Sequence, residues 1–175
     1  MPHVLIAFLL TFGPSLQTEL STVKSVEIQT ANSQTAEERE ADLRKWVAGY
    51  GESFGGIKYI YGGKTSKGFD CSGFTKFIFS TYGIQLSGHS QTQATEGKKI
   101  PLKEARRGDL IFFGKNGRVS HVGIICSNTE DGIVAVHSSL SKGIMTQNIS
   151  KSSYWRPKIL FTCDVITKYV DEGHY

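Results

Sequence analysis

Cys71 lies in the stretch of residues 68–74 (GFDCSGF), at the start of a one-sided apolar pattern. Apolar side chains recur at helical spacing at Phe74, Phe77, Ile78 and Tyr82, and Gly83 predicts the end of that helix. Unpaired N–H groups and the positive end of the dipole at a helix start favour a thiolate. The same amides point where an oxyanion forms when sulfur attacks a carbonyl. The pattern predicts a nucleophilic thiolate at Cys71; the alternative is a small buried apolar residue.

Two histidines are candidates for the base that a cysteine nucleophile requires. His121 and His137 lie on consecutive predicted strands. If residues 128–130 form the connecting loop, the two histidines lie directly opposite each other, with Cβ atoms roughly 4.5–5.5 Å apart. If residues 131–132 instead form a two-residue turn, His121 faces Lys142. We expect the first register, in which one histidine is the base and the other orients it.

A metal site is the other chemistry that these side chains suggest. Its ligands would be Cys71, His121, His137 and His89. The sequence contains no Cys-x-x-Cys or His-Glu-x-x-His spacing, and such regular spacing is typical of zinc sites. We therefore expect neither a metal nor a cofactor.

Two helices besides the one that carries Cys71 are predicted from capping boxes. Residues 35–38 (TAEE) start the first, and Gly49 and Gly51 are expected to end it. Its apolar stripe consists of Leu43, Trp46, Val47 and Tyr50. Residues 90–93 (SQTQ) start a shorter helix, which Gly97 is expected to end.

Strands are predicted mainly after the helices. They comprise residues 109–113, 121–126, 133–137 and 159–166, separated by turn-forming residues. Their connections are too short for parallel crossovers, so the sheet should be antiparallel. The order of elements predicts an α+β fold with N-terminal helices packed on a central antiparallel sheet.

The composition is that of one globular domain. Of the 175 residues 39% are hydrophobic and 21% are charged. The net charge is +4 and the basic residues are scattered, so we do not expect the protein to bind nucleic acid. We also expect a monomer. Cys126 and Cys163 are expected to be buried thiols on strands, and a disulfide between them is open if those strands are neighbours.

The N-terminal part of the chain differs in character from the rest. Residues 4–12 (VLIAFLLTF) form an apolar run that is too short to span a membrane. Residues 1–16 are therefore expected to be a signal peptide or an N-terminal apolar segment, and the protein to be exported to the periplasm or cell envelope. Polar residues 17–34 predict a linker, residues 35–170 the folded domain and residues 171–175 a tail.

Several motifs in order resemble those of the NlpC-type cysteine peptidases, papain-like endopeptidases that cut bacterial cell-wall peptides. The similar segments are residues 59–63 (YIYGG), 69–73 (FDCSG), 107–113 (RGDLIFF), 120–124 (SHVGI), 136–139 (VHSS) and 154–155 (YW). The resemblance extends from residue 58 to about residue 165 and implies a papain-like NlpC-type fold.

The resemblance also implies roles for individual residues. Cys71 would be the nucleophile, His121 the general base and later the acid, and His137 the residue that orients His121. Tyr59 matches the family's active-site tyrosine, whose hydroxyl lies near the substrate or the oxyanion. The residues expected to bind substrate or to shape the cleft and oxyanion site are Tyr59, Asp70, Ser72, Ser90 and Gln93.

The implied substrate is a peptidoglycan stem peptide. The family typically hydrolyses the bond between D-glutamate and diaminopimelate, or Lys in its place. Residues 86–90 (LSGHS) differ from the Leu-Pro-Arg-x-Ser of relatives, which leaves recognition of a substrate carboxylate open. An amidase or acyltransferase with the same fold, or a non-catalytic wall-binding module, are the alternatives.

Overall fold

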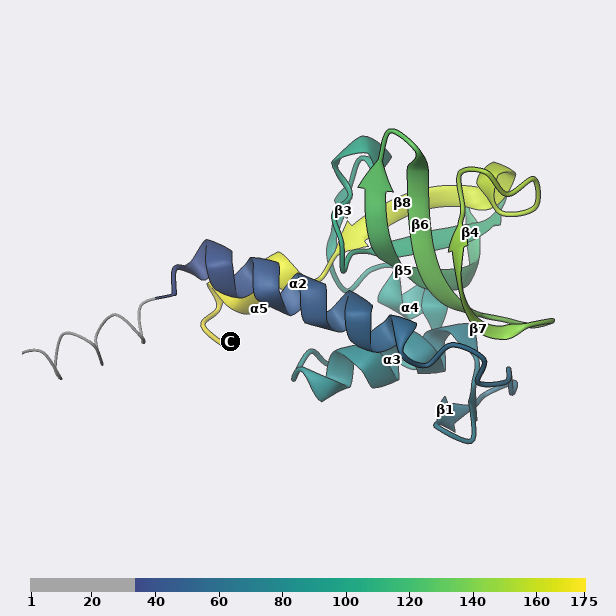
Figure 1. Ribbon diagram of the computed structural model, residues 1–175, viewed down its shortest axis with the longest axis horizontal. Helices are drawn as coiled ribbons and strands as arrows, with labels where there is room; N and C mark the ends of the chain where they lie inside the picture. The colour runs from purple at the N-terminus through teal and green to yellow at the C-terminus, as the bar shows by residue number, and fades with distance from the viewer. Residues whose placement is uncertain (1–33) are drawn as a thin grey trace, which may run out of the picture. The chain divides into compact units, whose positions relative to one another are not determined.

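The computed structural model describes residues 34–175, in which helices lie on one side of an antiparallel sheet (Figure 1). A compact unit begins at Ala36 and continues to Tyr175. The predicted apolar segment and nearly all of the predicted linker lie outside the described residues. Within residues 34–175 no helix combines the length and the apolar character that crossing a membrane requires.

Helix α2 (Ala36–Glu52) is the first element and packs on the sheet. It passes through Gly49 and Gly51, so the prediction that these glycines end it is wrong. A Cβ atom at Gly51 would lie 3.1 Å from Cγ1 of Val136. The glycine at this position therefore permits close packing of the helix on the sheet, and it does not act as a terminator.

Helix α3 (Cys71–Thr81) begins at the cysteine, as predicted, and its C-cap residue is followed by Gly83 in a left-handed conformation. Helix α4 (Ser90–Gln93) is shorter than predicted. Its N-cap is His89 and makes no side-chain capping bond, so the predicted capping box at Ser90 does not form.

The central sheet has six strands in the order β3-β8-β4-β5-β6-β7, and each neighbouring pair is antiparallel. The strands are β3 (Lys98–Ile100), β4 (Leu110–Lys115), β5 (Arg118–Thr129), β6 (Gly132–Ser139), β7 (Gly143–Asn148) and β8 (Ile159–Asp164). The predicted α+β class with an antiparallel sheet is confirmed. Strands β3 and β7 escaped prediction because the first is very short and the second is polar and lacks strict alternation.

Smaller elements complete the fold. A two-stranded hairpin, β1 (Lys64–Thr65) and β2 (Gly68–Phe69), precedes α3. The 3₁₀ turns are η1 (Leu102–Glu104) and η2 (Arg156–Lys158). Residue 166, predicted to end the last strand, instead begins helix α5 (Ile166–Asp171), because the backbone N–H of Ile166 donates to the Asp164 side chain, 2.9 Å away.

The hairpin of β5 and β6 has neither of the two predicted registers. Its turn is residues 130–131, and a bulge near Cys126 then shifts the pairing by one residue. A Cβ atom at Gly123 would lie 3.1 Å from Cβ of His137. Gly123 is therefore the neighbour of His137 across the strands, and the prediction that His121 lies directly opposite His137 is wrong.

The two faces of the sheet cover two separate cores. The large core lies on the helical side and includes Phe74, Ile78, Phe112, Val122 and Ile124. The small core lies on the other face and includes Ile111, Phe113, Ile125 and Ala135. Because side chains alternate along a strand, His121, which pairs with Phe113, belongs to the face of the small core. The cysteine helix and the histidines thus approach the site from different layers.

A buried ionic cluster joins the first helix to the sheet. Arg44 of α2 contacts Asp109 at 2.6 Å, Asp164 at 2.8 Å and Glu40 at 2.7 Å. Asp109 is 0% exposed. Asp109, the acidic residue of the RGDLIFF segment, therefore attaches α2 to the start of β4, and Asp164 attaches it to the end of β8.

Cys126 and Cys163 are buried free thiols, as expected. They lie on β5 and β8, and β4 separates these two strands. The condition for a disulfide, that their strands be neighbours, is not met. Burial raises the pKa of the Cys126 thiol to about 12 and that of Cys163 to about 11, so both remain protonated.

Candidate active site

Cys71 is held at the first turn of α3 by the residues that flank it. Asp70 is the N-cap, and its Oδ1 accepts a hydrogen bond from the backbone N–H of Gly73 at 2.6 Å. The hydroxyl of Ser72 donates to the carbonyl of Gly88 at 2.9 Å. A Cβ atom at Gly73 would collide with the carbonyl oxygen of Gly63. The sequence FDCSG is thus a capped turn in which the glycine allows the preceding loop to approach closely.

The thiol of Cys71 is protonated in the free protein. Burial raises its pKa, and the nearby charge of Asp70 acts in the same direction. Backbone hydrogen bonds from Val122, Ser72 and Cys71 itself oppose these effects but do not outweigh them. The direction of this pKa shift is opposite to the one expected from the helix start, because desolvation of this 9% exposed residue is the larger effect in the free protein.

His121 and His137 are joined by a hydrogen bond between their rings. Nε2 of His121 lies 3.0 Å from Nδ1 of His137. Because Gly123 is the neighbour of His137 across the strands, His121 occupies a diagonal position on the same face, which aromatic side chains can bridge. The two imidazole rings therefore make the predicted contact, although β5 and β6 pair in a different register from the one predicted.

Both imidazoles are neutral at neutral pH. Burial lowers the pKa of His121 to about 3, and the neighbouring His137 acts in the same direction. Burial also lowers the pKa of His137 to about 4. Each ring therefore carries one N–H, and the ring of His121 retains a lone pair that can accept a proton.

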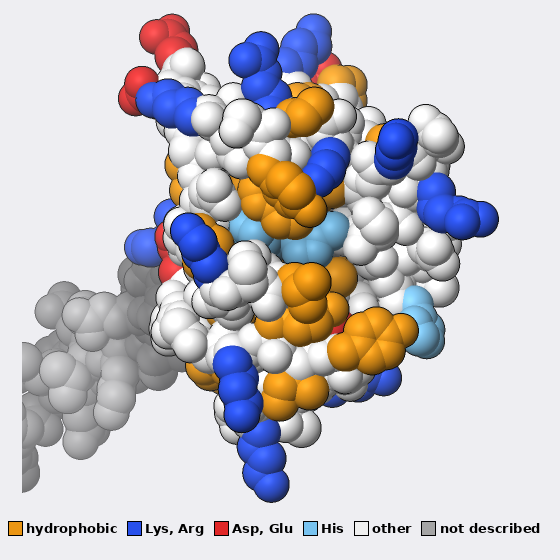
Figure 2. Space-filling model, turned by 90° about the vertical axis from the view of Figure 1, so that its right-hand side faces the viewer, with side chains coloured by type: hydrophobic (Ala, Val, Ile, Leu, Met, Phe, Trp, Pro, Cys, Tyr) orange, Lys and Arg blue, Asp and Glu red, His pale blue; other side chains and the backbone are white. Residues whose placement is uncertain are grey.

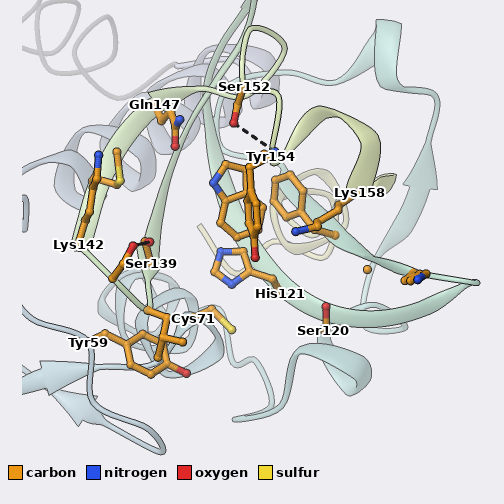
Figure 3. Close-up of a pocket in the computed structure, with 17 residues that line it drawn as sticks. Tyr59, Cys71, Ser120, His121, Ser139, Lys142, Gln147, Ser152, Tyr154 and Lys158 are labelled. Atoms are coloured by element: carbon orange, nitrogen blue, oxygen red, sulfur yellow. Dashed lines mark hydrogen bonds between the residues drawn. The ribbon is translucent and has the colours of Figure 1, made fainter.

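Trp155 covers the histidine pair. Its ring stacks on His121 with centroids 4.5 Å apart and meets His137 edge-on at 4.9 Å. The backbone N–H of Trp155 donates to the hydroxyl of Ser152 at 3.1 Å, drawn as the dashed line in Figure 3. Sequence analysis placed Trp155 only in a motif before the last strand. Its contact with the two imidazoles could not be predicted, because it depends on how distant segments of the chain pack together.

A cleft of about 630 Å³ lies over these groups, and its lining includes Tyr59, Cys71 and His121. Figure 2 shows histidine side chains at the bottom of a hollow bordered by hydrophobic side chains. In Figure 3 the side chains of Cys71 and His121 both point into this cleft. A nucleophile and a neutral base are therefore both accessible from one cleft.

Tyr59 and the backbone near it connect the two halves of the site. Tyr59 forms a bridge to Phe69, two residues before the cysteine. Burial raises the pKa of its hydroxyl, so the hydroxyl is protonated and can donate a hydrogen bond. On the other side, the buried hydroxyl of Ser138 donates to the carbonyl of Phe69 at 2.8 Å. This bond ties β6, which carries His137, to the turn that carries Cys71.

Ser90 and Gln93 do not line the cleft. Gln93 is 0% exposed, and its Nε2 donates to the carbonyls of Ser72 at 3.0 Å and Ser87 at 2.7 Å. Its Oε1 accepts from Thr75 at 2.8 Å. The structure therefore places Gln93 as an internal brace between α3 and the segment before α4. Among residues 34–175 no group of three or more His, Cys, Asp or Glu side chains is arranged to hold a metal ion.

The chain is similar to known proteins over this same region. Residues 56–163 match the NlpC/P60 family. Murein DD-endopeptidase MepS/Murein LD-carboxypeptidase of Escherichia coli strain K12 is 31% identical over 121 residues, which cover 69% of this chain and 62% of that protein. Gamma-DL-glutamyl hydrolase of Bacillus subtilis strain 168 is 35% identical over 127 residues, which cover 69% of this chain and 30% of that protein.

The fold is also found among solved structures. A crystal structure of an NlpC/P60 family protein from Bacillus cereus ATCC 10987 matches with a TM-score of 0.65 and 26% identity, over 70% of this chain and 40% of that one. This chain spans less than two thirds of the length of each protein named here. The family match nevertheless covers more than half of the chain and includes the cysteine, both histidines and the strands that carry them. The chain belongs to the NlpC/P60 family.

Proposed function

We propose that this protein is a cysteine peptidase that hydrolyses a peptide bond in bacterial cell-wall stem peptides through an acyl-enzyme. The observation that carries the proposal is that His121 lines the same cleft as Cys71, which begins a helix, and is hydrogen-bonded to the buried His137 behind it. A cysteine, a base and a group that orients the base are the parts that nucleophilic acyl transfer needs.

The chemistry follows from the protonation states of the free site. His121 takes the proton of the Cys71 thiol as the sulfur attacks the substrate carbonyl. The oxyanion forms near the amides at the start of α3, with the hydroxyl of Tyr59 at the same cleft. The protonated His121 then gives its proton to the leaving amine, and water hydrolyses the thioester with His121 again as base.

The lining of the cleft favours a substrate with carboxylates. Among the described residues that line it, three are lysines, Lys115, Lys142 and Lys158, and none is Asp or Glu. Stem peptides carry free carboxylates on D-glutamate and diaminopimelate, so the bond between these two residues, or between D-glutamate and Lys, is the proposed site of cleavage. Action on the cell wall implies a place in the cell envelope, and the protein is proposed to be a monomer.

The proposal is tested by digestion of purified cell walls and of defined stem peptides, with products identified by mass spectrometry. We expect the wild type to release fragments cut after D-glutamate and Cys71→Ala to release none while remaining folded by circular dichroism. Cys126→Ala, which removes a buried thiol away from the cleft, is the matched control and should retain activity.

The product masses also separate the alternatives. Undiminished release by Cys71→Ala would overturn the peptidase proposal. A muramoyl-amide cut would indicate an amidase, and a transferred acyl group would indicate an acyltransferase. The names of the two relatives give different bonds, so cleavage at the γ-glutamyl bond must be compared with cleavage at the DD and LD bonds.

A further inference from the structure

His137 carries a buried polar atom that has no partner. Its Nδ1 lies 3.0 Å from Nε2 of His121. Its other ring nitrogen, Nε2, is buried and has no hydrogen-bond partner among the described residues. His137 is 0% exposed, so water does not satisfy this atom from bulk solvent. A buried polar atom in this condition costs free energy unless a neighbour pairs with it.

The proposed reaction requires a proton on this unpartnered atom. For His121 to accept the thiol proton on Nδ1, its own proton must reside on Nε2 and be donated to His137. Nδ1 of His137 must then be the acceptor, which places the single proton of His137 on Nε2. The opposite arrangement of protons would occupy Nδ1 of His121 and prevent it from acting as the base. The site therefore needs a hydrogen-bond acceptor for Nε2 of His137.

Gln147 of β7 is the amide placed to supply that acceptor. His137 pairs with Met145 across β6 and β7, and Ala135 pairs with Gln147. Gln147 therefore projects from the same face of the sheet as His137, one diagonal step away. It lines the cleft, where Figure 3 shows its amide. The Gln147 side chain also opposes the effect of burial on the pKa of His137, as a nearby hydrogen-bonding group does.

We propose that Gln147 is a positioning residue whose side-chain carbonyl accepts the Nε2 proton of His137 and so selects the productive tautomer of both histidines. A rotation of the Gln147 side chain completes the bond. Nε2 of His121 then donates to His137, and Nε2 of His137 donates to Gln147. This arrangement leaves Nδ1 of His121 free to accept the proton of the Cys71 thiol. The expected effect of Gln147 on kcat rests on the proposed function, whereas its effect on the tautomers does not.

The test uses three full-length variants. Gln147→Met keeps the length of the side chain without its hydrogen bond, and Gln147→Glu keeps the acceptor. Thr146→Ala, at an exposed neighbouring position on β7, is the matched control. Two-bond ¹H–¹⁵N spectra of the imidazoles identify which nitrogen of His137 carries the proton, and kcat and KM are measured on a defined stem peptide.

We expect the wild type, Gln147→Glu and Thr146→Ala to show the proton of His137 on Nε2. In Gln147→Met we expect a mixture of tautomers and a fall in kcat of roughly 10-fold with KM unchanged. An unchanged tautomer and kcat in Gln147→Met would overturn the inference, as would loss of the tautomer in Gln147→Glu. The spectra need no substrate, so an inactive wild type would contradict the proposed function without deciding the role of Gln147.

Discussion

Cys71 and His121 begin the proposed reaction as a neutral pair. Burial raises the pKa of the thiol and lowers that of the imidazole to about 3, so each group is uncharged before substrate arrives. The ring of Trp155 stacks on the imidazole of His121 and is part of the surroundings that bury it. Proton transfer is therefore coupled to the attack on the carbonyl, when the developing charge has a partner.

The neutral state of Cys71 and His121 predicts how the reactivity of the thiol depends on pH. Alkylation of Cys71 by iodoacetamide should be slow at pH 7 and should rise by about tenfold per pH unit up to at least pH 9, because only the thiolate reacts. Cys71→Ala is the control that assigns the rate to this residue, since Cys71 lines the cleft and Cys126 and Cys163 do not. A rate that is already at its plateau below pH 7 would show that the thiolate is the resting form.

Two elements from different layers have to be held in register to form the site. Helix α3 belongs to the large core, whereas the histidines project from the other face of the sheet. The Ser138 hydroxyl bonds to the Phe69 carbonyl and so joins the strand of His137 to the turn before Cys71. This contact is one of those that hold Cys71 and His137 in position relative to each other.

Ser138→Ala should therefore damage activity more than stability. We expect the free energy of unfolding in urea to fall by about 1–2 kcal/mol, because the buried carbonyl of Phe69 loses its partner. The kcat on a stem peptide should fall further than this loss of folded protein explains. Ser53→Ala removes a similar but exposed hydroxyl-to-carbonyl bond and should change neither quantity appreciably. Equal kcat in wild type and Ser138→Ala would show that the contact does not position the site.

The stability of the whole molecule depends on keeping the two imidazoles neutral. Their pKa values in the folded protein, about 3 for His121 and about 4 for His137, lie below the ordinary value of 6.5. Protonation therefore favours the unfolded chain. The stabilising contribution is complete above pH 6.5 and is lost as the pH falls from 6.5 toward 4.

Urea unfolding between pH 7.5 and pH 4.5 measures this dependence. We expect the free energy of unfolding to fall below pH 6.5 with a slope of up to about 1.4 kcal/mol per pH unit for each histidine. His137→Gln should reduce the slope, whereas His89→Gln, at an exposed position, should leave it unchanged. A slope that His137→Gln does not alter would assign the dependence to other groups, such as the carboxylates around Arg44.

Local sequence patterns were enough to identify the main elements and the three residues of the proposed site, Cys71, His121 and His137. The apolar spacing of α3 is a short-range feature, so its start at Cys71 was predictable. The alternation of β5 and β6 likewise placed His121 and His137 on strands. The family resemblance added the order of these motifs along the chain, and the fold class followed from the order of helices and strands.

Tertiary structure decided how those groups work together. The bulge near Cys126 set the strand register, and a one-residue shift of this kind is not encoded in alternation alone. Packing decided that Gly51 lies inside a helix and that Gln93 is a brace rather than part of the cleft. Burial decided the charge of Cys71 and of both imidazoles, because desolvation depends on neighbours such as Trp155 that are distant in the chain. The sequence thus specified which residues make up the proposed site, and folding specified their protonation and their geometry.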